Sequence, residues 1–139
     1  PDGRIRVGIA GATVGDGRYN ATGEGQTRTT RTDRGAVVTH FVTIENDGTH
    51  AEAFRVRGQP STANYQVRYL SAGVDVSTKA RNGTYLTPVL APGEIRMIKV
   101  VVIVGARAPV GSQVSRLVTI SSASDPLQID VVRIIVRRR

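Results

Sequence analysis

The chain of 139 residues contains no cysteine. This absence excludes disulfide staples, catalysis by a thiol, and metal sites with cysteine ligands. It leaves the cellular compartment undecided, because a chain without cysteine folds equally well in oxidising and reducing surroundings. The first residue is Pro1 and not methionine, so we expect a processed product or a piece of a longer chain.

Aromatic residues are scarce, at 4% of the chain, whereas hydrophobic residues in total make up 40%. The core must therefore be built mainly from valine and isoleucine, whose branched side chains suit the half-buried surface of a sheet. No long helical pattern is present, and no apolar run approaches the ~20 residues of a membrane span. Together with the length, this composition predicts a single all-β domain.

Acidic residues are in the minority, with 11 Asp and Glu against 19 Lys and Arg, which gives a net charge of +8. One interpretation is an anion-binding surface, and the other is a compositional bias toward arginine. Arg55, Arg57 and Arg68 alternate with apolar residues, which predicts outward positions on strands and favours the second interpretation. Stacking aromatics are not interleaved with the arginines, which argues against nucleic-acid binding. The candidate anion contacts are Arg4, Arg6, Arg28, Arg31, Arg34, Arg137 and Arg138.

Residues that catalysis would need are equally sparse. The two histidines are His40, on an apolar strand face where we expect a hydrogen-bonded core residue, and His50, which we expect in solvent. No Gly-x-Ser-x-Gly elbow is present, and no glycine-rich phosphate loop with its lysine. The sequence therefore predicts a protein that is not an enzyme and has no cofactor.

Calcium is the one metal for which the sequence offers candidate ligands, because its acidic residues supply carboxylate oxygens. No Asp-x-Asp-x-Asp-Gly spacing supplies the six or more oxygens that a calcium loop provides, so the remaining alternative is a composite site at one end of the domain. Its candidate ligands are Asp2, Asp16, Asp47, Asp75, Asp125 and Asp130.

The chain divides into residues 1–35 and residues 36–139. In the first part Ile5, Val7 and Ile9 alternate with polar residues and predict one strand. The rest, as far as Gly35, is rich in glycine and threonine, with Tyr19 among its few apolar anchors, and we expect a long arm or loop. Residues 36–139 are expected to form the sandwich proper, so that the whole is one domain.

Turn signals divide the second part into short strands. Asn46-Asp47-Gly48 ends one strand, and Pro92-Gly93 precedes a long one that starts at Ile95. We therefore predict an immunoglobulin-like antiparallel β-sandwich of about eight or nine strands. The predicted core consists of Val38, Val42, Ile44, Phe54, Val56, Tyr65, Val67, Val100, Val102, Val118 and Ile120.

Three segments carry a resemblance to a known kind of module. They are Phe41-Val42-Thr43-Ile44-Glu45-Asn46-Asp47-Gly48-Thr49, Leu90-Ala91-Pro92-Gly93-Glu94, and Ala108-Pro109-Val110-Gly111-Ser112 with the strand that follows it to Asp125. They resemble immunoglobulin-like domains of bacterial extracellular proteins, including cell-adhesion-related repeats and domains appended to bacterial alpha-galactosidases. The resemblance covers residues 36–136 best. It implies an extracellular or cell-surface spacer, adhesion unit or assembly subunit, and it brings no catalytic residue with it.

Two segments, Val100–Val104 and Ile134–Val136, are apolar at consecutive positions, although one face of a sandwich strand normally meets water. Either the glycine- and threonine-rich segment covers these outer faces, or another copy does. We expect a self-associating or tandem-repeat subunit of a surface fibre, stalk or layer, whose arm could be deleted (residues 1–9) with loss of assembly but not of the fold. The expected interface residues are Ile5, Val7, Ile9, Tyr19, Val101, Ile103 and Ile135.

The alternative function is an accessory adhesion module that holds acidic polysaccharide or another anionic surface through its arginines. Under this interpretation the partner is an anionic polysaccharide and not another copy of the chain. Both interpretations place the protein outside the cell or on its surface.

Overall fold

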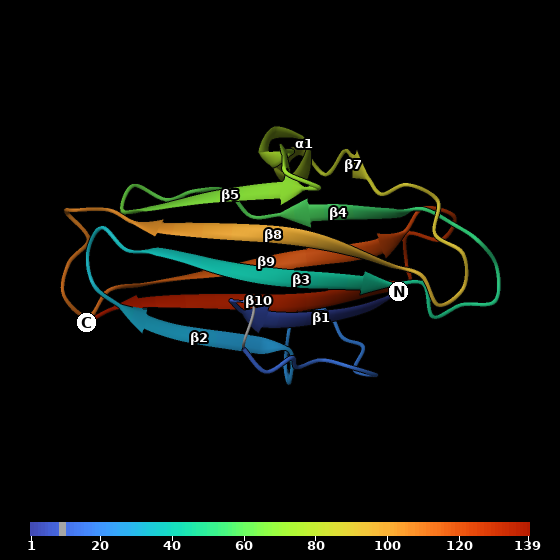
Figure 1. Cartoon of the computed structure of the whole chain (residues 1–139), viewed down its shortest axis with the longest axis horizontal. Coiled ribbons are helices and arrows are strands. Elements are labelled where there is room, and N and C mark those ends of the chain that lie inside the picture. The colour runs from blue at the N-terminus through green and yellow to red at the C-terminus, as the bar shows by residue number, and fades with distance from the viewer. Residues whose placement is uncertain (9–10) are drawn as a thin grey trace.

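The computed structural model describes residues 1–8 and 11–139 and shows two five-stranded sheets packed face to face (Figure 1). The first sheet has the order β1–β3–β8–β5–β6, and the second has the order β2–β10–β9–β4–β7. The strands of the first sheet are β1 (Asp2–Val7), β3 (Val37–Glu45), β8 (Ile95–Val104), β5 (Tyr65–Ser71) and β6 (Val74–Asp75). Those of the second are β2 (Thr27–Thr32), β10 (Ile129–Arg138), β9 (Gln113–Ser122), β4 (Phe54–Gly58) and β7 (Tyr85–Leu86).

The core lies between the sheets and follows the alternation of the sequence. In β3, Val38, His40, Val42 and Ile44 point inward and are buried, while the residues between them are half-buried or exposed. All eleven predicted core residues are buried. The predicted β-sandwich is therefore confirmed, and so are the outward positions of Arg55, Arg57 and Arg68.

The number and direction of the strands differ from the expectation. Residues 1–8 and 11–139 form ten strands, where about eight or nine were expected. Within these residues β2 pairs with β10 in parallel, whereas the other paired strands are antiparallel. The sequence of β2, Thr-Arg-Thr-Thr-Arg-Thr, has no apolar alternation, because this strand lies at the edge of its sheet and contributes little to the core. Parallel pairing with β10 joins residues far apart in the chain, which a local pattern does not report.

The turns at Asn46 and Pro92 lie in connections between the two sheets. β3 and β4 lie in different sheets, so the segment after Asn46 crosses from the first sheet to the second. The buried Asn46 side chain holds this crossing, because its Nδ2 donates to the carbonyl oxygens of His50 and Leu90, each at 2.8 Å. Gly93 has φ of 83°, a left-handed conformation that suits glycine at the turn before β8.

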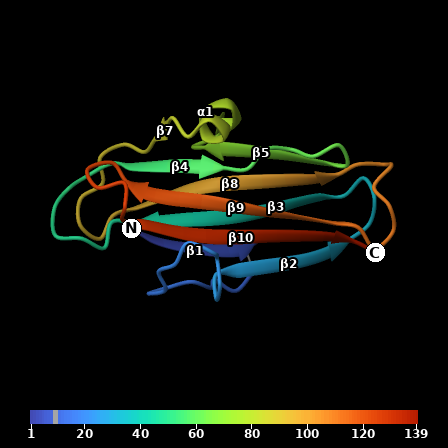
Figure 2. The same cartoon turned by 180° about the vertical axis from the view of Figure 1, so that it is seen from behind.

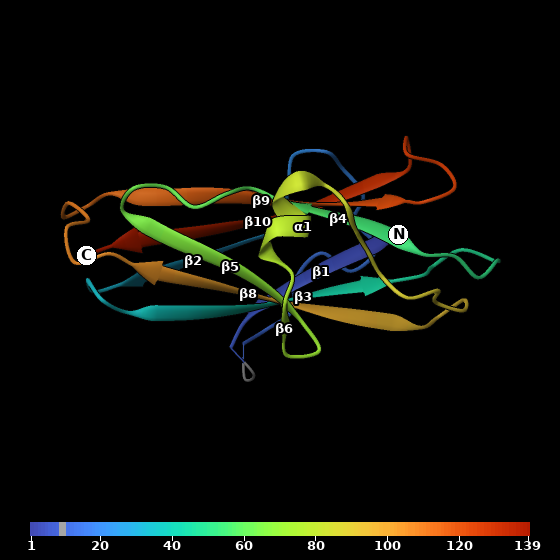
Figure 3. The ribbon, with the colours of Figure 1, turned by 90° about the horizontal axis from the view of Figure 1, so that it is seen from above.

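A short helix lies above the sandwich edge. α1 (Ser77–Asn82) packs against β4 and β5 (Figure 3). Gly83, with φ of 71°, ends the helix in the usual left-handed conformation. Among the described residues, no helix has the length and apolar character needed to cross a membrane.

Residues 1–8 and 11–35 do not form the predicted arm. β1 pairs along its full length with β3, and the side chain of Ile5 is completely buried in the core. Val14 exchanges two backbone hydrogen bonds of 2.9 Å with Ile5, so the segment after β1 folds back along its outer edge. β1 is therefore a core strand of its own sandwich, and we expect its deletion to unfold the domain and not to leave it folded.

Candidate functional surfaces

The outer face of the first sheet carries a row of outward apolar side chains, some exposed and some half-buried. Its outward side chains along β8 are Ile95, Met97, Val101 and Ile103, interrupted only by Lys99. Pairing with β3 and β5 places Val37 beside Ile103, and Phe41 and Leu70 on either side of Lys99. Ile95 and Val37 remain 55% and 61% exposed, which is high for aliphatic side chains on a sheet. We call these seven apolar residues, Val37, Phe41, Leu70, Ile95, Met97, Val101 and Ile103, the apolar stripe.

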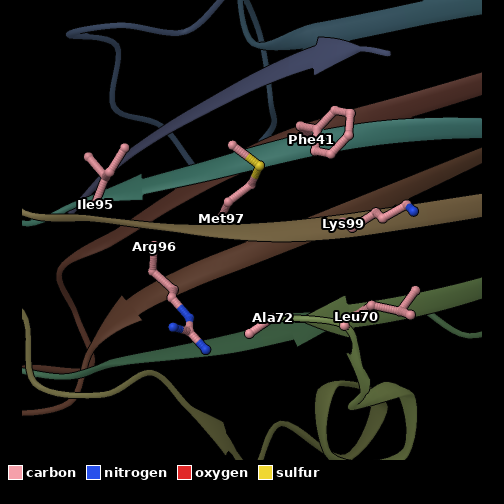
Figure 4. Close-up of a pocket in the computed structure, with 8 residues that line it drawn as sticks. Phe41, Leu70, Ala72, Ile95, Arg96, Met97 and Lys99 are labelled. Carbon is pink, nitrogen blue, oxygen red and sulfur yellow. The ribbon is translucent and has the colours of Figure 1, made fainter. Parts of the chain in front are cut away.

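A hollow of about 420 Å³ lies on this face, between β3, β8 and the β5–β6 turn (Figure 4). Phe41, Leu70, Ile95 and Met97 surround it, and Lys99 supplies an amine at its side. Neither histidine nor any carboxylate lines this hollow. It offers an apolar contact with two cations, Arg96 and Lys99, and not the converging acid, base and nucleophile of a hydrolytic site.

The expected interface residues do not lie on one surface. Val101 and Ile103 are half-buried members of the apolar stripe, whereas Ile135 is half-buried on the outer face of the second sheet. Ile5 is buried in the core, Val7 is half-buried at the end of β1, and Ile9 lies outside the described residues. Tyr19 is exposed, and its hydroxyl donates to Asp47 Oδ2 at 2.6 Å. Only two of the seven are thus placed together.

The expected anion contacts also separate into two groups. Arg31, Arg34 and Arg137 are exposed. The other four are engaged within the molecule: Arg4 lies in ion pairs, Arg6 stacks 4.9 Å above the ring of Phe41, and Arg28 and Arg138 donate to the carbonyl oxygens of Ala12 and Ala108. An exposed cationic region therefore remains where β2 and β10 end.

Three carboxylates gather at β1: Asp2, Asp16 and Glu45. The guanidinium of Arg4 pairs with all three, at 3.6 Å from Asp2 and 3.7 Å from Asp16. Burial raises the pKa of Asp2 to about 6, and this side chain accepts from the backbone of Gly17. A calcium ion here would have to displace Arg4, which already supplies the positive charge. Glu45 is not among the calcium ligands that the sequence predicted.

Asp130 is a buried carboxylate that holds the N-terminal segment in place by hydrogen bonds. It is completely buried, and its Oδ2 accepts from the backbone nitrogen of Gly3 at 2.7 Å. Its Oδ1 accepts from Gln26 Nε2 at 2.6 Å, from the backbone nitrogen of Asn20 at 3.2 Å, and from its own neighbour Val131. Burial raises the pKa of Asp130 in spite of these donors. The carboxylate thus fastens three points of the N-terminal segment to β10.

His40 differs from the expected hydrogen-bonded core histidine. It is completely buried, and neither ring nitrogen has a hydrogen-bond partner of normal geometry among the described residues. Burial lowers the pKa of His40 to about 4, and the nearby Val100 backbone offsets this only in part. The neutral imidazole is therefore the form that the core accepts.

Comparison with known proteins supports the fold. No family model and no curated protein matches the chain. BcpA, the major pilin subunit of Bacillus cereus, is similar with a TM-score of 0.51 and 10% identity, over 98% of this chain and 39% of BcpA. The secreted serine protease VesC from Vibrio cholerae is similar with a TM-score of 0.49 and 13% identity, over 80% of this chain and 21% of VesC. The N-terminal domain of PorA has the same TM-score and identity, over 99% of this chain and 97% of that domain.

The similarity to BcpA supports the β-sandwich fold and, at 10% identity, nothing more. The chain spans about a fifth of the length of VesC and 30% of the Vibrio cholerae protease VesB, which is also similar. The likeness to a pilin agrees with the coarse resemblance to domains of bacterial surface proteins. The finer resemblance, to domains appended to alpha-galactosidases, stays a prediction.

Proposed function

We propose that the chain is a non-enzymatic structural module of an extracellular fibre, stalk or layer, and that copies associate through the apolar stripe. The observation that carries this proposal is the row of outward apolar side chains on β8, a strand in the middle of its sheet. An isolated antiparallel sandwich normally keeps this face polar. BcpA, which has a similar fold, is a pilin subunit, so the fold is compatible with such a role.

The size of the stripe sets the expected strength of association. A strand of 10 residues is about 33 Å long, and three neighbouring strands are about 14 Å wide. The resulting ~450 Å² is below the ~800 Å² that each partner buries in an ordinary stable complex. Single copies should therefore associate weakly, and a durable assembly would need repeats linked in one chain or held at high local concentration.

Sedimentation velocity over a concentration series tests the proposal. The chain should form dimers or larger species at high concentration, and Met97→Lys should return it to the monomer. Leu127→Lys is the matched control, because Leu127 is the most exposed of the large hydrophobic residues described and lies outside the stripe. A monomer at all concentrations, or equal effects of the two substitutions, would refute association through this face.

Acidic polysaccharide is the second candidate partner. On the second sheet, β2, β4, β7 and β9 contain no acidic residue, and the one in β10, Asp130, is buried. Arg55, Arg57, Arg133 and Arg137 lie on the outward side of these strands. Retention on immobilised polygalacturonate that falls in the double variant Arg55→Gln/Arg57→Gln, but not in Arg68→Gln of the first sheet, would support this function.

A further inference from the structure

Three of the four long edges of the sandwich are closed by the chain itself. At the edge of β5, the hydroxyl of Ser61 accepts from the Val67 nitrogen at 2.8 Å, and that of Ser77 accepts from the Tyr69 nitrogen at 2.9 Å. Each hydroxyl oxygen accepts a hydrogen bond that the carbonyl oxygen of a neighbouring strand would otherwise accept. Exposed strand edges invite pairing with other chains, and covering them is the usual protection.

The edges of β4 and β1 are closed in similar ways. Thr87 accepts from the Phe54 nitrogen through its hydroxyl and donates its own nitrogen to the Phe54 oxygen, beside the β4–β7 pairs. On β1, Val14 pairs with Ile5, and Asp130 accepts from the Gly3 nitrogen.

The edge of β2 is different. The nitrogens of Arg133 and Arg139 in and after β10 donate to the oxygens of Gln26 and Thr32, so even-numbered residues of this segment face β10. The backbone groups of a strand alternate in direction, and those of Thr27, Thr29 and Arg31 therefore face away from the sheet. Among the described residues, none bonds to the outward nitrogen or oxygen of Thr29 or Arg31. In Figures 1 and 2, β2 is the outermost strand of the second sheet.

The positive charge around the edge of β2 favours an acidic binding partner. Arg31 lies opposite Arg137 in the parallel pair, with the exposed Arg34 just beyond β2, and Asp33 is near Arg139 at 3.8 Å. A second copy of this chain would bring the same arginines against them, since its own net charge is also +8. An acidic chain is attracted instead. A polysaccharide cannot match the regular spacing of outward N–H and C=O groups, whereas an extended polypeptide can.

We propose that the free edge of β2 binds an extended acidic segment of a partner polypeptide, which adds to the second sheet beside Thr29 and Arg31. This inference is independent of association through the apolar stripe, which lies on the other sheet.

The test uses a fluorescein-labelled peptide of alternating valine and glutamate, as long as β2, and the intact chain. Binding is followed by fluorescence anisotropy, and amide hydrogen exchange is read by NMR. We expect saturable binding, with exchange at the Thr29 and Arg31 amides slowed at least about tenfold. A peptide of the same charge with N-methyl groups on alternate residues should bind at least about tenfold more weakly, because its pairing edge is blocked.

Substitutions at the edge of β2 test the same proposal from the side of the protein. Thr29→Pro removes an outward donor at a position where edge strands tolerate proline, and should weaken binding at least about tenfold, while Thr29→Val should not. Arg31→Glu should weaken binding similarly, and Arg55→Glu, three strands away in the same sheet, should have little effect. If Thr29→Pro does not fold, the N-methylated peptide decides the same question.

Several outcomes would overturn the proposal. Equal binding of the N-methylated peptide would mean attraction by charge without strand pairing. Equal binding of a valine and glutamine peptide would exclude charge as the basis of selection. Absence of peptide binding, together with binding of polygalacturonate that depends on Arg31, would assign the arginines to a polysaccharide. A dimer that Thr29→Pro abolishes would make a second copy the occupant.

Discussion

His40 links the stability of the domain to pH because its neutral ring is buried, and neither ring nitrogen has a hydrogen-bond partner of normal geometry among the described residues. In the unfolded chain its pKa is near 6.5, and in the folded chain it is about 4. Between pH 6.5 and pH 4 the His40 ring is protonated in the unfolded state but stays neutral in the folded state. The free energy of unfolding therefore decreases as pH falls through this range. Asp2 acts in the opposite direction, since its raised pKa lets the folded state bind a proton below about pH 6.

Replacement of His40 by leucine isolates this contribution. Urea unfolding of the native chain and of His40→Leu should give a difference in unfolding free energy that changes by about 2 to 3 kcal/mol between pH 7 and pH 4.5, to the disadvantage of the native chain at the lower pH. His50→Gln, which removes the exposed histidine, is the control substitution. A constant difference for His40→Leu would mean that the ring is protonated in the core.

Asp130 stabilises the attachment of the N-terminal segment. Asp130→Ala leaves the donors of Gly3, Asn20, Gln26 and Val131 without their acceptor, and should cost about 3 kcal/mol or more of unfolding free energy. Asp130→Asn keeps one acceptor oxygen and should cost clearly less. Chemical denaturation measures both, and NMR should show faster amide exchange at Gly3 and Asn20 in the alanine variant. Equal losses in the two variants would contradict this account.

At the scale of single elements, sequence reasoning succeeded where a strand alternates between core and solvent. β3 and β5 do so, and their inward residues were identified correctly. It failed at β2, whose composition suits an edge and whose partner in the second sheet is distant in sequence. The apolar run in β8 was recognised, but its outward members could not be assigned to a covering segment without the sheet order. Asp130 gave only a weak signal, a carboxylate within an apolar run at an inward position.

The serines that close β5 make a prediction at the scale of this element. Ser61→Ala removes the acceptor of the Val67 nitrogen and should cost about 1 kcal/mol in urea unfolding. The double variant Ser61→Ala/Ser77→Ala should also aggregate faster, as light scattering would show, because the edge of β5 is then open. Ser115→Ala is the control, since its hydroxyl caps no strand edge among the described residues. Unchanged stability and scattering in the double variant would show that the serines do not protect the edge.

At the scale of the whole molecule, the two sheets present outer faces of different chemistry. The first carries the apolar stripe, and the second carries exposed arginines with serine and threonine between them. Such a module can make an apolar contact on one side and an electrostatic one on the other. The two contacts respond to salt in opposite ways, because each copy carries a net charge of +8. Repulsion between copies opposes association through the stripe, whereas attraction favours an acidic partner at β2.

Raising NaCl from about 20 mM to about 500 mM shortens the screening length from roughly 20 Å to roughly 4 Å. Self-association measured by sedimentation velocity should then strengthen several-fold, since salt screens the repulsion and leaves apolar burial intact. Binding of the acidic peptide, measured by anisotropy over the same range, should weaken about tenfold or more. Met97→Lys should remove the first response and keep the second, and Arg31→Glu should do the reverse. Responses of the same sign would mean that a single electrostatic surface accounts for both contacts.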